Sequence, residues 1–356
     1  MELSFRRFDL RLARRWTIAS RTGPGGGPGT EEFPVVILRL RDTDGLEGFG
    51  ESAPSNRYAE NVDSVERLLA RIDPARLSFN DLPASRAYLD SLAPNEAAAK
   101  CALDIALLDG AGHRRSSPVH QLFNLTFTEN RHLTSFSIGL DTPQVIEQKV
   151  REAADFPILK LKLGSFSDRE NLAALRTAAP TKTVRVDANE AWKTKDEALR
   201  HLEWLASDGH IEFVEQPMPA STPPADRAWL KARSPLPLMA DESYRTAADL
   251  SEVADTFHAV NVKLVKTGGI TGAHAALQAA RAAGLKTMLG CMIESSVLIA
   301  AAAHLADLTD YLDLDGNLLI TNDPFLGPTA HAGQLSFLKA PSPSGLQVIR
   351  GPGAPV

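Results

Sequence analysis

Short β-branched runs alternate with amphipathic stretches from residue 132 to residue 316. Eight of these runs predict strands, over residues 132–140, 156–164, 182–190, 211–217, 235–243, 258–268, 285–295 and 310–316. The stretches between them, such as 142–155 and 193–209, repeat apolar residues at helical spacing. Eight strands alternating with seven helices indicate parallel βαβ units, so we expect a TIM-type (β/α)7β barrel in the α/β class.

The first 125 residues show a different pattern. Alternating stretches at 3–20 and 31–52 predict an antiparallel meander, with DTDG at 42–45 as a hairpin turn, and helices are expected near 62–73 and 94–112. We therefore predict an α+β capping domain over 1–125, the barrel over 126–322, and a return of residues 323–356 to the capping domain. The stretch GPGGGPG at 23–29 is expected to form a flexible loop inside the meander.

Composition narrows the class of protein. Hydrophobic residues make up 44% and the net charge is −6, which gives no reason to expect binding to nucleic acid or to an anionic membrane. The two cysteines match no metal or redox spacing, and the N-terminus lacks the apolar run of a secretory signal, so a cytoplasmic enzyme is expected. The apolar run at 297–306 is too short to span a bilayer. A homo-oligomer is compatible with these features.

Charged residues stand at the C-terminal ends of the predicted strands, where barrel enzymes carry their reacting groups. In chain order they are Lys160, Lys162, Asp187, Glu215, Asp241 and Lys263. From Lys162 onward, successive residues are separated by intervals of 22 to 28 residues, one βα unit each, so these side chains are expected to converge. Three carboxylates from adjacent strands form an oxygen-rich site that suits Mg²⁺, with Mn²⁺ as a substitute.

The lysines suggest acid–base chemistry. Lys160 and Lys162 are two residues apart on one strand and face the same side. Burying both unpaired would be costly, and carboxylate partners together with an anionic substrate explain them. Their mutual repulsion near a metal is expected to lower the pKa of at least one. Lys263 enters from across the barrel, and a base on each side of a metal-bound carboxylate suits reversible proton transfer at the adjoining carbon.

The motifs LKLK, VDAN, EQP, ADES and VKLVKTGG together resemble those of the enolase superfamily, and within it the muconate-lactonising-enzyme subgroup. The resemblance covers nearly the whole chain, including the alanine-rich stretch 97–123, which looks like the family's capping-domain helix. It implies that Lys162 and Lys263 form the acid/base pair and that Lys160 helps the metal to stabilise an enediolate. It also implies a set of metal ligands: Asp187, Glu215 and Asp241.

The strand-eight sequence LDLDG resembles the Asp-x-Asp motif of dipeptide epimerases, which implies that Asp313 and Asp315 bind the substrate's free α-ammonium group. We therefore expect Mg-dependent epimerisation of the C-terminal residue of an L,L-dipeptide. N-acylamino acid racemase, o-succinylbenzoate synthase and cycloisomerase activities use the same lysines and stay open. A non-catalytic module that binds metal or peptide is a further alternative to an enzyme. For the two aspartates, the alternative to substrate binding is a structural pairing with local lysines.

Two further residues concern specificity. Tyr58, in the loop NRYAEN, is expected to close over the site from the capping domain. Arg21, in IASRT, resembles the arginine that Ala-Glu epimerases place over an acidic side chain, which would favour an acidic C-terminal residue. The alternative is a small or hydrophobic dipeptide, with Arg21 as a solvated surface charge.

Overall fold

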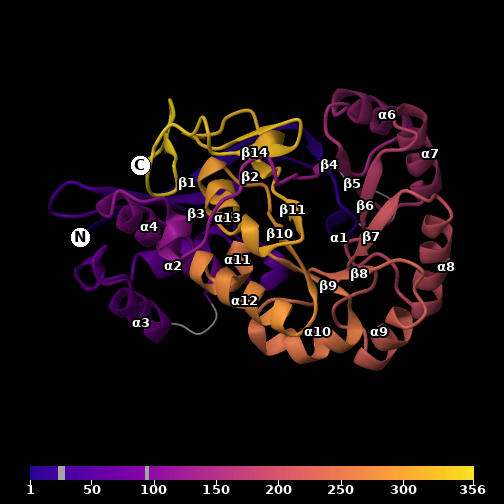
Figure 1. Ribbon diagram of the computed structural model, residues 1–356, viewed down its shortest axis with the longest axis horizontal. Coiled ribbons are helices and arrows are strands. Elements are labelled where there is room, and N and C mark those ends of the chain that lie inside the picture. Colours follow the sequence, from indigo (N-terminus) through magenta and orange to yellow (C-terminus); the bar gives the residue numbers. More distant parts are fainter. Residues whose placement is uncertain (23–28, 93–95) are drawn as a thin grey trace.

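The computed structural model describes the chain except for residues 23–28 and 93–95; the side chains of Arg21 and Thr22 are also outside the described part. The predicted loop at 23–29 therefore lies almost entirely outside the described residues. Eight parallel strands form one sheet in chain order (Figure 1). They are β4 (Phe136–Ile138), β5 (Ile158–Lys162), β6 (Thr183–Asp187), β7 (Ile211–Glu215), β8 (Leu238–Ala240), β9 (Ala259–Val262), β10 (Lys286–Gly290) and β11 (Tyr311–Asp313). A parallel bridge between Thr134 and Leu312 joins the two ends of the sheet, so it closes into the predicted barrel.

Seven helices of at least seven residues connect these strands and cover the outside of the barrel, and the short α11 (Leu264–Thr267) precedes one of them (Figure 1). They are α6 (Pro143–Glu152), α7 (Asp168–Ala178), α8 (Lys195–Ala206), α9 (Pro224–Lys231), α10 (Leu250–Thr256), α12 (Ile270–Ala282) and α13 (Ser296–Ala303). Capping residues define some of their starts: the Thr194 side chain accepts from the Glu197 N–H and begins α8. Because helices cover the sheet, the outward positions of its strands are mostly apolar. The inward positions carry the charged residues and also an apolar cluster that includes Phe213, Met239 and Met288.

The capping domain is built on an antiparallel sheet of β1 (Glu2–Trp16), β2 (Thr30–Arg41) and β3 (Glu47–Ser52). The predicted DTDG turn joins β2 to β3, with Gly45 at φ +83°, a conformation that favours glycine. The alanine-rich helix α4 (Ala97–Arg114) packs on β3 at very close range. A Cβ at Gly50 would overlap with the carbonyl oxygen of Ala102, which explains the glycines of this strand.

Two further helices of this domain differ in how well the sequence predicts them. The predicted helix near 62–73 is α2 (Val62–Leu69), whereas α3 (Leu82–Leu92) was not predicted. Only three residues of α3 are buried, Ser85, Tyr88 and Leu89, so its apolar periodicity is weak.

The C-terminal tail contacts residues of the N-terminal region. The Leu346 N–H donates to Asp109 of α4 at 2.7 Å, and the Val119 N–H donates to the Gly345 carbonyl at 2.9 Å. The tail forms two short two-stranded sheets, β12 (Phe325–Leu326) with β15 (Ile349–Arg350) and β13 (Thr329–His331) with β14 (Gln334–Ser336). Figure 1 shows this tail in yellow beside the purple capping domain.

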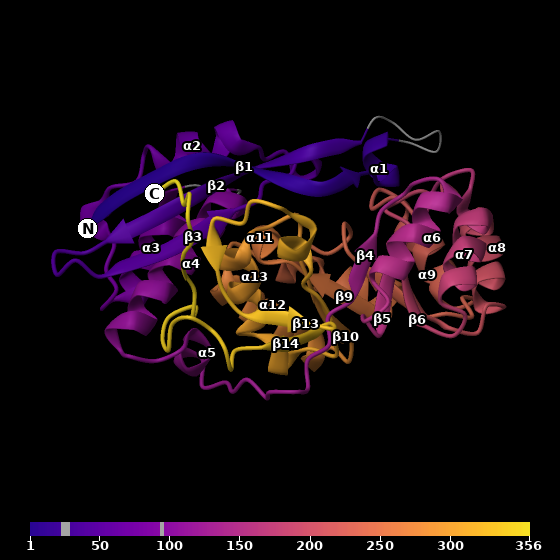
Figure 2. The same cartoon turned by 90° about the horizontal axis from the view of Figure 1, so that it is seen from above.

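The β1–β2 ribbon extends from the capping domain to the far side of the barrel, where it reaches the short helix α1 (Ala19–Thr22) (Figure 2). An ion pair of 2.5 Å between Arg14 and Glu152 of α6 ties it there. This ribbon brings Trp16 and Phe33 to the open end of the barrel, where both line the main cavity. No helix in the described part of the chain is both long and apolar enough to cross a membrane.

Candidate active site

Five consecutive strands bring charged side chains to the same end of the barrel. Lys162 lies directly opposite Asp187 in the ladder between β5 and β6, and Asp187 lies opposite Glu215 in the next. Asp241 directly follows β8, and Lys263 directly follows β9. The structure therefore brings together the residues that strand spacing predicted to converge.

The three acids form a compact buried cluster. One oxygen each of Asp187, Glu215 and Asp241 lies within 4.8 Å of the others, and all three side chains are buried. Glu215 accepts a hydrogen bond of 2.7 Å from the Asn261 amide, and Asp187 accepts one of 2.9 Å from the Asn189 N–H. A buried set of carboxylate oxygens with fixed orientation fits a hard divalent cation.

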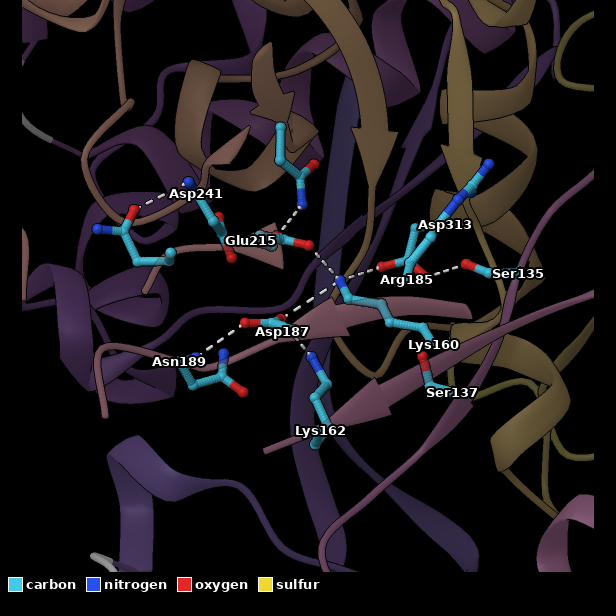
Figure 3. A network of polar contacts seen from close by, with 12 residues as sticks. Ser135, Ser137, Lys160, Lys162, Arg185, Asp187, Asn189, Glu215, Asp241 and Asp313 are labelled. Atoms are coloured by element: carbon cyan, nitrogen blue, oxygen red, sulfur yellow. Dashed lines mark hydrogen bonds and ion pairs between the residues drawn. The ribbon is translucent and has the colours of Figure 1, made fainter. Parts of the chain in front are cut away.

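Lys160 occupies the centre of the polar network (Figure 3). Its Nζ lies 2.7 Å from Glu215 Oε2, 2.7 Å from Asp313 Oδ2 and 3.3 Å from Asp187 Oδ2. Lys162 donates to the same Asp187 oxygen at 2.6 Å. The carboxylate partners expected for the two inward lysines are thus present.

A second pair of lysines holds Asp241. Lys263 donates to its Oδ2 and Lys266 to its Oδ1, both at 2.8 Å. Lys266 is fully enclosed and also donates to three backbone carbonyls, those of Asp241, Tyr244 and Asn261. Lys266 therefore orients Asp241, whereas Lys263 also lines the cavity.

The buried charges of the site shift one another's pKa values. Burial lowers the pKa of Lys160, but three neighbouring carboxylates outweigh burial and raise it well above its usual range. Burial likewise lowers the pKa of Lys263, and Asp241 reverses the effect. Burial and the charge of Asp187 raise the pKa of Glu215 to about 7. The lowered pKa expected for one lysine of the Lys160–Lys162 pair is therefore not found at Lys160; the lowering was expected beside a cation, which would offset the attraction of the same carboxylates.

Asp313 and Asp315 both line the cavity but differ in their contacts. Asp313 accepts from Lys160 and from the Ser135 hydroxyl, each at 2.7 Å. Asp315 accepts a 2.6 Å hydrogen bond from the Ser137 N–H through one oxygen. Asp313 is thus paired with a local lysine, whereas Asp315 is held by backbone.

A cavity of about 550 Å³ lies between these strand ends and the capping domain. Tyr58 lines it from the capping side, and burial raises the pKa of its phenol. Beside it, Arg57 binds Glu190 of the β6–α8 loop through two hydrogen bonds, of 2.7 and 2.8 Å. This fork fastens the capping loop to the barrel. The side chain of Arg21 lies outside the described residues, so its role stays a prediction.

Comparison with known proteins places this geometry in a family. Residues 144–324 match the family described as enolase C-terminal domain-like, and residues 28–124 match the mandelate racemase / muconate lactonizing enzyme N-terminal domain. The chain belongs to the enolase superfamily. The predicted family is confirmed.

Several members of the superfamily resemble this chain along nearly its whole length. An L-Ala-D/L-amino acid epimerase from Pedosphaera parvula is 55% identical, with 98% of this chain and 99% of that protein covered. A substrate-liganded L-Ala-D/L-Glu epimerase from Bacillus subtilis has a TM-score of 0.88 at 26% identity, covering 98% of each chain. A dipeptide epimerase from Enterococcus faecalis, complexed with Mg and L-Leu-L-Tyr, has a TM-score of 0.86 at 30% identity, again covering 98% of each chain.

Some residues of this enolase-superfamily site were not singled out from the sequence. Asn261 is two residues before Lys263, so strand alternation could have placed it on the same face. Ser135 and Ser137 show the same alternation on the first strand, beside the two aspartates. The Arg57–Glu190 pair joins segments 133 residues apart, and no local pattern signals it.

Proposed function

We propose that this protein is a magnesium-dependent epimerase that inverts the α-carbon of the C-terminal residue of an L,L-dipeptide. One observation carries the proposal: neighbouring strands present Lys162, Asp187, Glu215, Asp241 and Lys263 in that order. A lysine therefore flanks the three acids on each side, and both lysines line one cavity. Inversion at a carbon beside a metal-bound carboxylate requires a base on each face.

The acid cluster fits the metal that this reaction needs. Its three ligands are all oxygens, which suits Mg²⁺, with Mn²⁺ as a substitute. When bound, the ion supplies positive charge that holds the substrate's terminal carboxylate and stabilises the negative charge that develops on it. Lys160 adds a second positive charge at the same place, because it contacts both Glu215 and Asp187.

The two flanking lysines exchange protons with the α-carbon. One lysine, as a neutral amine, removes the α-proton and becomes an ammonium group. The substrate becomes a planar enediolate, and the opposite lysine, which starts as an ammonium group, returns a proton to the other face. The number of protons is conserved, and exchange with solvent resets the pair. Lys162 and Lys263 each serve one face.

The other end of the substrate explains the preference for a dipeptide. A free α-ammonium group needs an anionic partner, and Asp315 lines the cavity beside Asp313. N-acylated amino acids, the substrates of the racemase alternative, carry no such cation. Tyr58 covers the bound substrate from the capping side.

The test follows the α-proton in D₂O. The full chain is incubated with Mg²⁺ and a library of L-Ala-L-Xaa dipeptides. We expect deuterium at the α-carbon of the second residue only, together with the L,D product, and we expect a chelator to stop both reactions until Mg²⁺ is restored. Exchange confined to N-acylated amino acids would favour the racemase instead, and no exchange into any substrate would favour a non-catalytic binding module.

A further inference from the structure

The capping-domain wall of the cavity carries a carboxylate that no described cation neutralises. Glu32, the third residue of β2, lines the cavity together with Thr30, Phe33 and Pro34. Among the described residues, its side-chain oxygens have no hydrogen bond or ion pair; its contacts to Thr30 come from the backbone. Its cross-strand partner, Arg11, forms no ion pair with it within the described part of the chain.

By contrast, the lysine and arginine side chains that line the cavity in the described part of the chain are already paired with carboxylates. Lys160, Lys162 and Lys263 each lie within 2.8 Å of a carboxylate oxygen on the barrel side. Arg57, on the capping side, is bound by both oxygens of Glu190. Within the described residues, an acidic substrate side chain would therefore meet no unpaired cation, whereas a cationic one would meet Glu32.

A second acid lies on the same wall. Glu60 lines the cavity, and one of its oxygens accepts a 2.9 Å hydrogen bond from the Ala98 N–H. Burial raises the pKa of Glu60 to about 7, so it carries only part of a charge near neutrality. Glu32, by contrast, is exposed.

The rest of the wall suits a long aliphatic stem. Trp16, Phe33 and Pro34 of the capping domain line the cavity, together with Ile293 of the barrel. Lysine and arginine side chains combine an apolar stem with a cationic head, so the stem can lie along these residues while the head reaches a carboxylate.

We propose that the enzyme prefers dipeptides whose C-terminal residue has a cationic side chain, lysine or arginine, and that Glu32 selects them. This substrate class rests on the proposed epimerisation of dipeptides. It differs from the acidic class that Arg21 would favour.

The test compares two substrates of matched shape. L-norleucine has the four side-chain carbons of lysine without its ammonium group, so L-Ala-L-Lys and L-Ala-L-norleucine differ by that group. We expect kcat/KM to favour L-Ala-L-Lys by about tenfold at low salt, because a charged hydrogen bond partly open to solvent is gained. The advantage should shrink as salt screens the pair. Glu32→Gln, which keeps the side-chain shape, should bring the ratio of the two kcat/KM values to about one.

Glu31→Gln is the matched control. Glu31 is the preceding residue on the same strand, is 71% exposed, and pairs with Arg15 at 3.3 Å instead of lining the cavity. This variant should keep the wild-type ratio. Turnover of L-Ala-L-norleucine without an advantage for L-Ala-L-Lys, or a ratio that survives Glu32→Gln, overturns the substrate class and leaves the epimerase standing. If no dipeptide of any kind is turned over, the proposed function fails and this inference fails with it.

Discussion

Asp315→Asn is expected to impair recognition of free dipeptides more specifically than Asp313→Asn, although the two aspartates share one motif. Asp313 uses one oxygen to hold Lys160 and the other to accept from Ser135. Asp315 accepts from the Ser137 N–H through Oδ2, the Ser137 side chain also stabilises its charged form, and its Oδ1 has a weak 3.8 Å contact with the Cys291 thiol. Within the described residues no lysine or arginine forms an ion pair with Asp315, so its carboxylate can accept from the substrate's ammonium group.

The size of the effect follows from that contact. A hydrogen bond between charged partners contributes roughly 1.5–3 kcal/mol, and about 1.4 kcal/mol corresponds to a factor of ten in kcat/KM. Asp315→Asn should therefore lower kcat/KM for a free dipeptide by about 10- to 150-fold. An N-acylated amino acid lacks the ammonium group and should be little affected. Asp313→Asn instead removes a partner of Lys160, so it should lower turnover of both substrate types alike.

The pH profile gives a second readout of Asp315. Burial and the charge of Asp313 raise the pKa of Asp315 to about 6, so this acid is a carboxylate above pH 6 and neutral below it. For free dipeptides, kcat/KM should fall as the pH drops through about 6, and Asp315→Asn should lose this part of the profile. Both substrates are assayed by α-proton exchange across pH 5–8. Two results would refute the assignment of the ammonium site. One is an equal loss of kcat/KM for both substrates in Asp315→Asn. The other is a fall of kcat/KM at acidic pH that is the same in this variant as in the wild type.

Three further predictions concern the residues around the site. Asn261→Leu removes the amide that orients Glu215 at 2.7 Å and should weaken Mg²⁺ binding by about 10- to 100-fold in calorimetric titration; an unchanged affinity would contradict this role. Lys266→Met leaves Asp241 Oδ1 and three buried backbone carbonyls without their donor, although Lys263 still holds Asp241 Oδ2. It should lower the free energy of unfolding of the metal-free protein by about 3–5 kcal/mol in urea, and a loss below about 1 kcal/mol would argue against it. Burial raises the pKa of Glu51 from 4.5 to about 8, so the folded state retains its proton and the free energy of unfolding should fall as pH rises between these values. In urea titrations at several pH values, the free energy of unfolding of Glu51→Gln should depend less on pH than that of the wild type. If the two free energies differ by the same amount at every pH, Glu51 does not titrate in this range.

The reacting groups could be located from strand periodicity because parallel neighbours keep their register. Lys162, Asp187 and Glu215 are separated in sequence by whole βα units, and the ladder places them directly opposite one another. The same alternation that places Lys160 beside Lys162 also places Asn261 beside Lys263.

Contacts that depend on the path of a loop could not be read in this way. The fork between Arg57 and Glu190 exists because the capping loop descends onto the β6–α8 loop, and neither segment has a periodic pattern. The difference between Asp313 and Asp315 likewise depends on which groups of the first strand reach each carboxylate. The missed helix α3 buries too few residues for its periodicity to be visible.

The two-base mechanism is tested most directly by α-proton exchange in Lys162→Ala and Lys263→Ala, each assayed in D₂O with the L,L and the L,D form of one dipeptide. Both variants should have lost epimerisation, because each lacks the base or acid for one face. Each should still exchange the α-proton of one diastereomer, and the two variants should act on opposite diastereomers. Mg²⁺ binding and the urea midpoint of each variant serve as controls for an intact fold. Equal residual epimerisation in both variants would contradict the mechanism, because it would mean that another base reaches the α-carbon.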